Sequence, residues 1–464
     1  MHIDRTIDLQ RREFLRRSLI LGAYGMAAPL VSTLGMVEAA SAAGGPADYK
    51  ALVCVFLFGG NDYGNTIVPY DPLSYSAYST IRQTLATPRE QLAATALNPS
   101  VALPNARTLA LAPQLAPLKP IFDAGHLGIM LNIGNLVQPT TLAEYKARSV
   151  PLPPKLFSHA NQQKEWQTGG SDKLTRGWGG GMADLMMNAN SMPTFSCISV
   201  AGNAVFMSGH EAIQYQMSSN GPPEIRNLGT RIYTSSNVSS TLRALITSPR
   251  SHWLEQNLNQ ITKRAIDAQA ACAPALAAVP AFATAYDASN GLAGQLKMVA
   301  RLIAARTSLG ATRQVFFVST GGFDLHSNFV TGHPRVLTTV ANALASFYAT
   351  TVELGVADKV TSFTASDFGR TLSSNGDGAD HGWGSHHFVM GGAVKGGRFY
   401  GQAPDVSVSG PDDVGQGRLL PTLSVDQLAY TLGGWMGISD TNLASLVVPQ
   451  IRNFSARNLG FMAA

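Results

Sequence analysis

Residues 51–58 read Ala-Leu-Val-Cys-Val-Phe-Leu-Phe, and Gly59-Gly60-Asn61-Asp62 follows at once. The apolar run is rich in strand-forming residues and too short for a typical helix, so it predicts a β-strand buried on both faces. Such strands belong to parallel sheets that helices cover on either side. Because ligands of open α/β sheets bind beyond the carboxyl ends of the strands, the polar residues after this run are candidates for a functional site.

Four later segments repeat this strand pattern: 127–133, 314–320, 360–365 and 388–390. Between them, residues 292–309 and 333–354 have the apolar spacing of amphipathic helices. Alternation of strands and helices with connections of this length is typical of α/β proteins. The sequence therefore predicts a three-layer α/β fold whose central sheet is mostly parallel and doubly wound.

The first 42 residues have the organisation of an export signal. Gln10–Arg17 resembles the twin-arginine motif, an apolar stretch covers 19–34, and Ala40-Ser41-Ala42 offers a cleavage site. A retained membrane anchor is the alternative, but the apolar stretch is short and contains glycine and proline. We expect residues 1–42 to be a signal peptide read by the twin-arginine export machinery. The mature chain, 43–464, is then expected in the periplasm or outside the cell.

The composition narrows the function classes. Hydrophobic residues make up 45% of the chain and charged residues 14%, which favours a globular protein with a large core. The formal net charge is +5 without a basic stripe, so nucleic acid is not an expected partner. We expect one domain over 43–464, with a lid or insertion at about 195–285, and no later segment that spans a membrane. The three cysteines do not form a disulfide framework, although one bridge remains open.

Acidic and imidazole side chains gather after the predicted strands. They are Asp62, Asp324, His326, Asp367, Asp380, His381, His386 and His387. Carboxylates and neutral imidazoles at one sheet edge suit a divalent cation such as Zn²⁺, Mn²⁺, Mg²⁺ or Ca²⁺. Each residue also has a structural interpretation, because an Asp after a strand often caps a turn and a single His is often only hydrogen-bonded. Taken together, the set predicts a metal site.

Two further residues are candidates for catalysis. Ser158 lies where a loop is expected to enter a helix, so it is either a nucleophile beside free N–H groups or an ordinary N-cap. Arg370 either holds an oxygen of a phosphate or sulfate group or pairs with a neighbouring Asp. The G-x-S-x-G, Walker A, dinucleotide-binding and H-E-x-x-H motifs do not occur, so the hydrolase and nucleotide-binding classes that they mark are not indicated.

Six segments carry a resemblance to a known family: Val53–Pro69, Ser158–Gly169, Arg176–Trp178, Thr320–Asn328, Ser366–Thr371 and Asp380–Gly401. Together they resemble the domain-of-unknown-function 1501 family of bacterial exported proteins, from about Lys50 to the C-terminus. One difference is Asp367, where the family pattern has Glu. That family is in turn distantly similar to the alkaline phosphatase and sulfatase superfamily, which implies an alkaline-phosphatase-like fold.

The superfamily resemblance implies a role for each matching residue. It implies Ser158 as the nucleophile and a metal-ligand set of Asp62, Asp324, His326, Asp367 and His381. The superfamily's Asp-His pair reads Asp367-Phe368 here, so one usual ligand is missing. The leading hypothesis is an exported, metal-dependent hydrolase of phosphate or sulfate esters that acts on a small anionic ester or a sulfated glycan. The alternative is a non-catalytic binding or assembly protein on a degenerate scaffold, and a weaker third is a metal-free Ser-His-Asp esterase.

Overall fold

The computed structural model describes residues 49–169, 176–225, 228 and 236–463. Two compact units divide the chain: Pro46–Pro223 with Cys272–Ala464, and Met1–Gly45 with Glu224–Ala271. The expected signal peptide, residues 1–42, lies outside the described residues. The expected insertion at 195–285 spans the two junctions between the units. All the residues of the candidate site belong to the larger unit.

A nine-stranded sheet forms the centre of the larger unit in the described part of the chain. Its order is β10-β4-β9-β8-β1-β7-β5-β6, and β11 pairs with β4. The strands are β1 (Lys50–Leu57), β4 (Leu127–Gly134), β5 (Cys197–Ser199), β6 (Tyr215–Gln216), β7 (Arg313–Thr320), β8 (Val360–Ser366), β9 (Ser385–Met390), β10 (Arg398–Tyr400) and β11 (Leu423–Ser424). Only β9 runs antiparallel to its neighbours β4 and β8 among these described pairings. The predicted mostly parallel sheet is confirmed.

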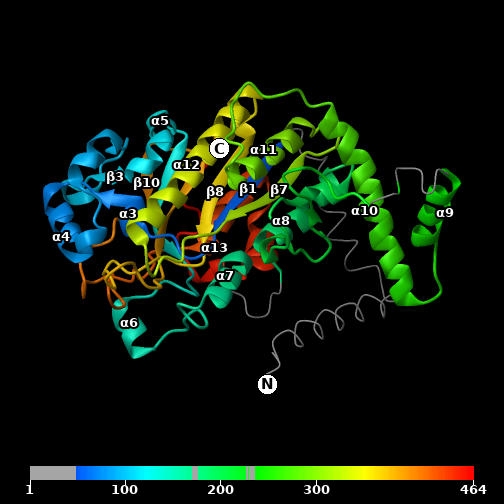
Figure 1. Cartoon of the computed structure of the whole chain (residues 1–464). Helices are drawn as coiled ribbons and strands as arrows, with labels where there is room; N and C mark the ends of the chain where they lie inside the picture. The colour runs from blue at the N-terminus through cyan, green and yellow to red at the C-terminus, as the bar shows by residue number, and fades with distance from the viewer. Residues whose placement is uncertain (1–48, 170–175, 226–227, 229–235, 464) are drawn as a thin grey trace, which may run out of the picture. The chain divides into compact units, whose positions relative to one another are not determined.

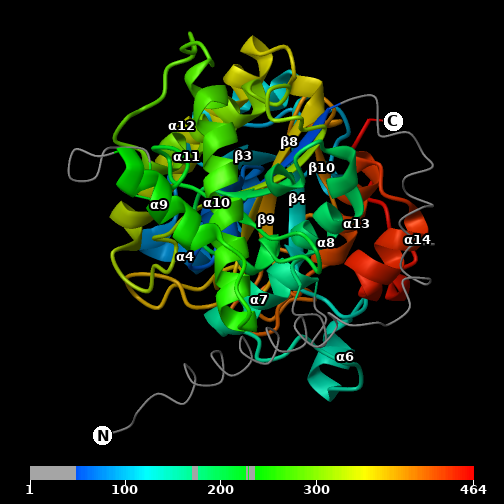
Figure 2. The same cartoon turned by 90° about the vertical axis from the view of Figure 1, so that its right-hand side faces the viewer.

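Helices cover both faces of this sheet (Figures 1 and 2). The helices α11 (Gly291–Ala304) and α12 (Phe329–Glu353) lie on one face, and α8 (Trp178–Met186) and α13 (Val425–Met436) on the other. The other α-helices of the described ranges are α3 (Tyr63–Thr66), α4 (Pro72–Arg82), α5 (Lys119–Asp123), α6 (Leu142–Ala147), α7 (His159–Thr168), α9 (Ser236–Thr247), α10 (Trp253–Ala277) and α14 (Asp440–Asn442). A small antiparallel pair joins β2 (Ile67–Pro69) to β3 (Leu109–Leu111).

Strand β1 lies in the centre of the hydrophobic core. Each of its residues from Ala51 to Leu57 is at most 3% exposed, and burial of one such aliphatic or aromatic side chain stabilises the fold by about 1.5–3 kcal/mol. The thiol of Cys54 is free and buried here, as are those of Cys197 and Cys272. The chain therefore packs its cysteines as small apolar residues.

The register of three strands sets the position of the site. β1 pairs in parallel with β7 on one side and β8 on the other, so that Leu57 lies beside Thr320 and Ser366. The loops that leave these strands therefore emerge side by side. Gly59 lets two of them touch, because a Cβ at this position would lie 2.3 Å from the backbone nitrogen of Asp324. Its φ of +119° also favours glycine.

No helix in the described ranges has the length and apolarity needed to cross a membrane.

Candidate metal centre

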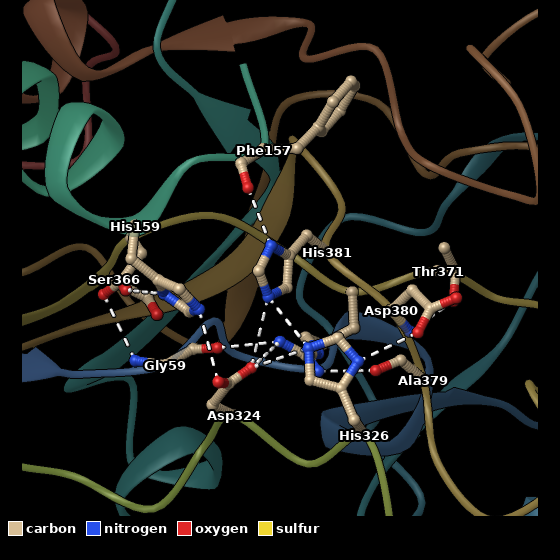
Figure 3. A network of polar contacts seen from close by, with 12 residues as sticks. Gly59, Phe157, His159, Asp324, His326, Ser366, Thr371, Ala379, Asp380 and His381 are labelled. Carbon is tan, nitrogen blue, oxygen red and sulfur yellow. Dashed lines mark hydrogen bonds and ion pairs between the residues drawn. The ribbon is translucent and has the colours of Figure 1, made fainter. Parts of the chain in front are cut away.

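Three histidines and one aspartate meet at the carboxyl edge of the sheet, and we call them the histidine cluster (Figure 3). His159 is the first residue of α7, and His381 lies shortly before β9. Asp324 and His326 follow β7. Asp324 is central: its Oδ2 is 3.3 Å from His159 Nε2, and its Oδ1 is 3.3 Å from His381 Nε2. His326 Nε2 lies 3.2 Å from the same Oδ1 and 2.9 Å from His381 Nε2.

In each of the three imidazole rings, Nδ1 lies at hydrogen-bond distance from an oxygen atom that carries no proton. Asp367 Oδ2 lies 2.6 Å from His159 Nδ1, Asp380 Oδ1 lies 2.9 Å from His326 Nδ1, and the backbone oxygen of Phe157 lies 2.7 Å from His381 Nδ1. Carboxylates and carbonyls only accept hydrogen bonds, so their positions assign the ring proton to Nδ1 in all three rings. The three Nε2 lone pairs are then left to point toward one another and toward Asp324.

Acceptors that face one another in this way repel, and a cation between them would relieve the repulsion, as the Arg370 guanidinium does in part at Asp324 Oδ1. His159 Nε2 is buried and has no hydrogen-bond partner in the structure, which is the kind of orphaned atom that a metal satisfies. Four ligands around Zn²⁺ in a tetrahedron are about 3.3 Å apart, given metal–ligand bonds of about 2.0–2.1 Å. The separations of His159 Nε2 and of His381 Nε2 from the carboxylate oxygens of Asp324, both 3.3 Å, are close to that value, and ligand atoms of these three residues all lie within 4.8 Å of one another. His159, Asp324 and His381 therefore have ligand atoms close enough together for one divalent ion, and His326 is not part of this group among the described residues.

The pKa values of residues in and around the histidine cluster also favour the binding of a divalent ion. Burial lowers the pKa of His381 below its usual value, so this ring is neutral at pH 7 and its Nε2 can donate to a metal. Burial raises the pKa of Asp324, but the hydrogen bond and charge of Arg370 outweigh it and the pKa is lowered overall. A hydrogen bond from Asn375 is the main cause of the lowered pKa of Asp380. Both carboxylates are therefore ionised at neutral pH.

Asp367, expected as a ligand, contacts the ring of His159 instead. Its Oδ2 accepts hydrogen bonds from His159 Nδ1 at 2.6 Å and from Gln163 Nε2 at 2.8 Å, and its Oδ1 accepts one from Gly59 N at 3.2 Å. The side chain is completely buried. A carboxylate in this position orients a metal-binding histidine and makes it more basic.

Asp62, also expected as a ligand, is paired with the Arg82 guanidinium instead. Its Oδ1 accepts the N–H of Asn65 at 2.7 Å, which caps α3, and forms a buried ion pair with Arg82. Among the described residues it is not part of the group in which ligand atoms of His159, Asp324 and His381 all lie within 4.8 Å of one another. The position of Asp62 agrees with the other interpretation, in which it caps the start of a helix.

Ser158 and Arg370, the two candidates for catalysis, both form side-chain hydrogen bonds. Ser158 is the N-cap residue of α7, yet its hydroxyl does not cap the helix and accepts a hydrogen bond from Asn161 at 2.9 Å. Arg370 is fully buried, and its Nη1 donates to Asp324 Oδ1 at 2.7 Å and to the Gly59 oxygen at 3.0 Å. Of its two alternatives, the structure therefore places Arg370 in the pair with an Asp.

His386 and His387, which lie in β9, have structural roles. Burial lowers the pKa values of His386 and His387 to about 3. His386 Nδ1 accepts the N–H of Asn132 at 3.0 Å, and His387 Nδ1 lies 3.1 Å from the hydroxyl of Thr364. Both rings serve the packing of β9.

His159 was missed by the sequence analysis, which considered only its neighbour Ser158. It starts a helix rather than following a strand, so the strand-end pattern does not include it. The signal that was available is its place directly after a proline-containing loop, at a helix start whose free N–H groups favour anionic ligands.

Comparison with solved structures finds similar chains at low identity. Ps i-CgsB shares 9% identity, with 88% of this chain and 77% of that chain covered and a TM-score of 0.36. The C-terminal periplasmic domain of EcEptC from Escherichia coli, solved with Zn, shares 11% identity over 88% of both chains, with a TM-score of 0.35. The PsFucS1 sulfatase from Pseudoalteromonas sp. shares 10% identity over 89% of this chain and 73% of that chain, with a TM-score of 0.34.

A comparison with curated proteins finds no match. The family described as "Protein of unknown function (DUF1501)" matches residues 49–447. The resemblance seen in the six sequence motifs is therefore confirmed, and the chain belongs to the DUF1501 family.

Proposed function

We propose that the protein is a metal-dependent hydrolase of phosphate or sulfate esters that acts outside the cytoplasm. The observation that carries the proposal is the convergence of three Nε2 lone pairs on the carboxylate of Asp324, with each ring proton held on the far side. Metal-binding histidines typically have outer hydrogen bonds of this kind, which supports the proposal. The export part rests on the twin-arginine motif of residues 10–17.

The proposed ligands are His159, Asp324 and His381, and His326 Nε2 lies beside them, 2.9 Å from His381 Nε2. A divalent ion held by them would supply Lewis-acid chemistry, polarising an ester oxygen and lowering the pKa of a water. Asp324 and His326 are 46% and 44% exposed in their side chains, so a substrate can reach the site. A single ion is proposed, because Arg82 already compensates the charge of Asp62.

The charges of the chain favour an anionic substrate once an ion is present. Asp324, Asp367 and Asp380 carry three negative charges, and Arg370 and Arg418 carry two positive charges at the same site. The remaining charge is −1, and a divalent ion would make it +1. The N-terminus of α7, where His159 sits, adds positive potential from its free N–H groups.

Ser158 is the proposed nucleophile. Its hydroxyl oxygen would form a bond to phosphorus or sulfur as the ester oxygen leaves, and its proton would pass to solvent, since the side chain is partly exposed. A water molecule would then release the phosphate or sulfate and restore the hydroxyl. Asn161, whose amide donates to Ser158 Oγ, holds this oxygen in place.

Two observations favour the alternative, a binding or assembly protein. Arg370 Nη1 lies 2.7 Å from Asp324 Oδ1 and gives this carboxylate a counter-charge without any metal. Phe368 also packs against two of the proposed ligands, with ring centroids 4.8 Å from His159 and 4.7 Å from His381. In that case the cluster would be a structural polar network.

Elemental analysis of protein purified without chelator decides between the two. We expect about one equivalent of a divalent metal in the parent, its loss in Asp324→Ala, and its retention in Asp123→Ala, an exposed aspartate on α5. A panel of phosphate, sulfate and sulfated-oligosaccharide esters should show activity that falls at least about 10²-fold in Ser158→Ala. Folded parent protein that holds no metal and cleaves no ester at saturating Zn²⁺ or Mn²⁺ would refute the hydrolase and favour the binding protein.

A further inference from the structure

Arg418 lies beside the histidine cluster, in the segment between β10 and β11. Its Nε donates to the backbone oxygen of His381 at 2.7 Å, and its Nη1 donates to the oxygen of Gly415 at 3.1 Å. Its Cζ lies 5.3 Å from the centroid of the Phe157 ring, within the range of a cation–π contact. The guanidinium therefore contacts both the backbone of a proposed metal ligand and the residue that precedes the proposed nucleophile.

The backbone on both sides of Arg418 is fixed to segments that build the metal centre. The oxygen of Gly417 accepts the N–H of Leu372 at 3.2 Å, in the segment that follows β8. The oxygen of Leu419 accepts the N–H of Gly384 at 2.8 Å, directly before β9. An arginine whose backbone and Nε are both held loses little conformational freedom when it binds a ligand.

The charge of Arg418 is available for a ligand. In the part of the chain that the structure describes, Arg418 forms no ion pair and its Nη2 has no hydrogen-bond partner. The side chain is only partly buried, so that Nη2 is open to solvent. Arg370 differs, because it is fully buried and both its Nη atoms donate to the chain, Nη1 to Asp324 and Nη2 to a backbone oxygen. Of these two arginines, Arg418 is the one that can bind an anion.

The guanidinium of Arg418 lies beside the proposed metal position rather than at it. His381 faces Asp324 with Nε2 of its ring, and it faces Arg418 with its backbone oxygen. Figure 3 shows the carbonyl of Phe157 directed toward His381 and the Phe157 ring turned away from the histidine rings. Because Arg418 lies over that ring, its charge is placed next to the ester group that the metal and Ser158 would hold, and not on it.

We propose that Arg418 and the Phe157 ring form a second anion subsite, which takes a further negatively charged group of the substrate beside the ester that is cleaved. This rests on the proposed function and narrows its substrate class to esters with at least one additional anionic group. A planar guanidinium suits the oxygens of a sulfate, phosphate or carboxylate group, and the aromatic ring against it holds its plane in one orientation.

Calorimetric titration of the metal-loaded protein with non-hydrolysable sulfonates tests this. Ethanesulfonate carries one anionic group, ethanedisulfonate adds a second sulfonate, and sulfopropanoate adds a carboxylate instead. We expect at least one doubly charged probe to bind about tenfold or more tightly than ethanesulfonate, and Arg418→Gln to remove this advantage. Metal content should not change in this variant. Arg418→Lys keeps the charge without the planar group and should retain part of the advantage.

The matched control is Arg452→Gln, an exposed arginine that should keep the whole advantage of the doubly charged probes. The probe that binds more tightly assigns the second group to sulfonate-like or to carboxylate chemistry. The inference is wrong if the metal-loaded parent binds all three probes alike. It is also wrong if both Arg418 variants lose the metal or weaken all three probes equally, because Arg418 would then only support His381. A parent without metal refutes the proposed function itself, and this inference with it.

Discussion

At the scale of the residue, the outer hydrogen bonds of the histidine cluster matter as much as its ligands. Asp367 fixes the proton of His159 on Nδ1 and so leaves Nε2 free to bind the proposed metal. We predict that Asp367→Asn lowers the affinity for Zn²⁺ about 10- to 100-fold, because an amide neither accepts as strongly nor fixes the same proton position. Competition with a chromogenic chelator measures this. Asp377→Asn, an exposed aspartate that accepts the Asn328 N–H, is the control, and equal affinities of the two variants would contradict the role of Asp367.

Single residues also show where sequence reasoning stops. Asp324, His326 and His381 stood out because polar residues after buried strands of a parallel sheet must share one edge, and the structure brings them together. Asp62 obeyed the same rule, yet the Arg82 guanidinium reaches it from α4. A buried arginine leaves no periodic signal in the sequence. His159 and the Phe157 carbonyl depend on how α7 enters, which the strand pattern does not contain.

At the scale of the element, α7 connects the histidine cluster to a buried acidic residue. His159 begins the helix, and Glu165 in its last turns lies near Asp426 at the start of α13. Burial raises the pKa of Asp426 to about 8, and the charge of Glu165 adds to the rise. The folded chain therefore holds this acid protonated near neutral pH, while the unfolded chain ionises it near pH 4. Stability from this group is complete below pH 4 and is lost as the pH rises toward 8.

We therefore predict that Asp426→Asn stabilises the protein at neutral pH. The amide is neutral at every pH, so the variant should gain about 1–3 kcal/mol over the parent at pH 7 and almost nothing at pH 4. Urea unfolding at both pH values measures the difference. Asp440→Asn, at the start of α14, offers an exposed comparison. A loss of stability at pH 7 would show that the folded state uses the ionised carboxylate.

The elements themselves were largely accessible from the sequence. The predicted strands at 314–320 and 360–365 correspond closely to β7 and β8, since continuous apolar runs have few other places in a soluble α/β fold. The short strands β5, β6, β10 and β11 have two or three residues each, and no periodicity can mark them. The direction of β9 was also not visible, because a buried antiparallel strand has the same composition as a parallel one.

At the scale of the whole molecule, the proposed metal centre exists only in the folded chain. His159 and His381 are 222 residues apart in the sequence, and the edge of the sheet brings them together. The twin-arginine route carries folded proteins, so a chain exported this way can receive its ion in the cytoplasm. This agrees with a site built from distant segments, which an unfolded chain could not hold.

We predict that the protein is exported and that its export depends on the paired arginines of the expected signal peptide. Replacing Arg11 and Arg12 together with lysine should retain the full-length precursor in the cytoplasm, while replacing Arg16 and Arg17 should leave most of the protein exported. Fractionation with an antibody against the mature chain measures both. Metal analysis of the retained precursor then adds a second result: a bound ion shows that loading precedes export. Mature protein outside the cytoplasm in the Arg11 and Arg12 variant would instead point to a route for unfolded chains, on which the centre must be filled after the chain has crossed.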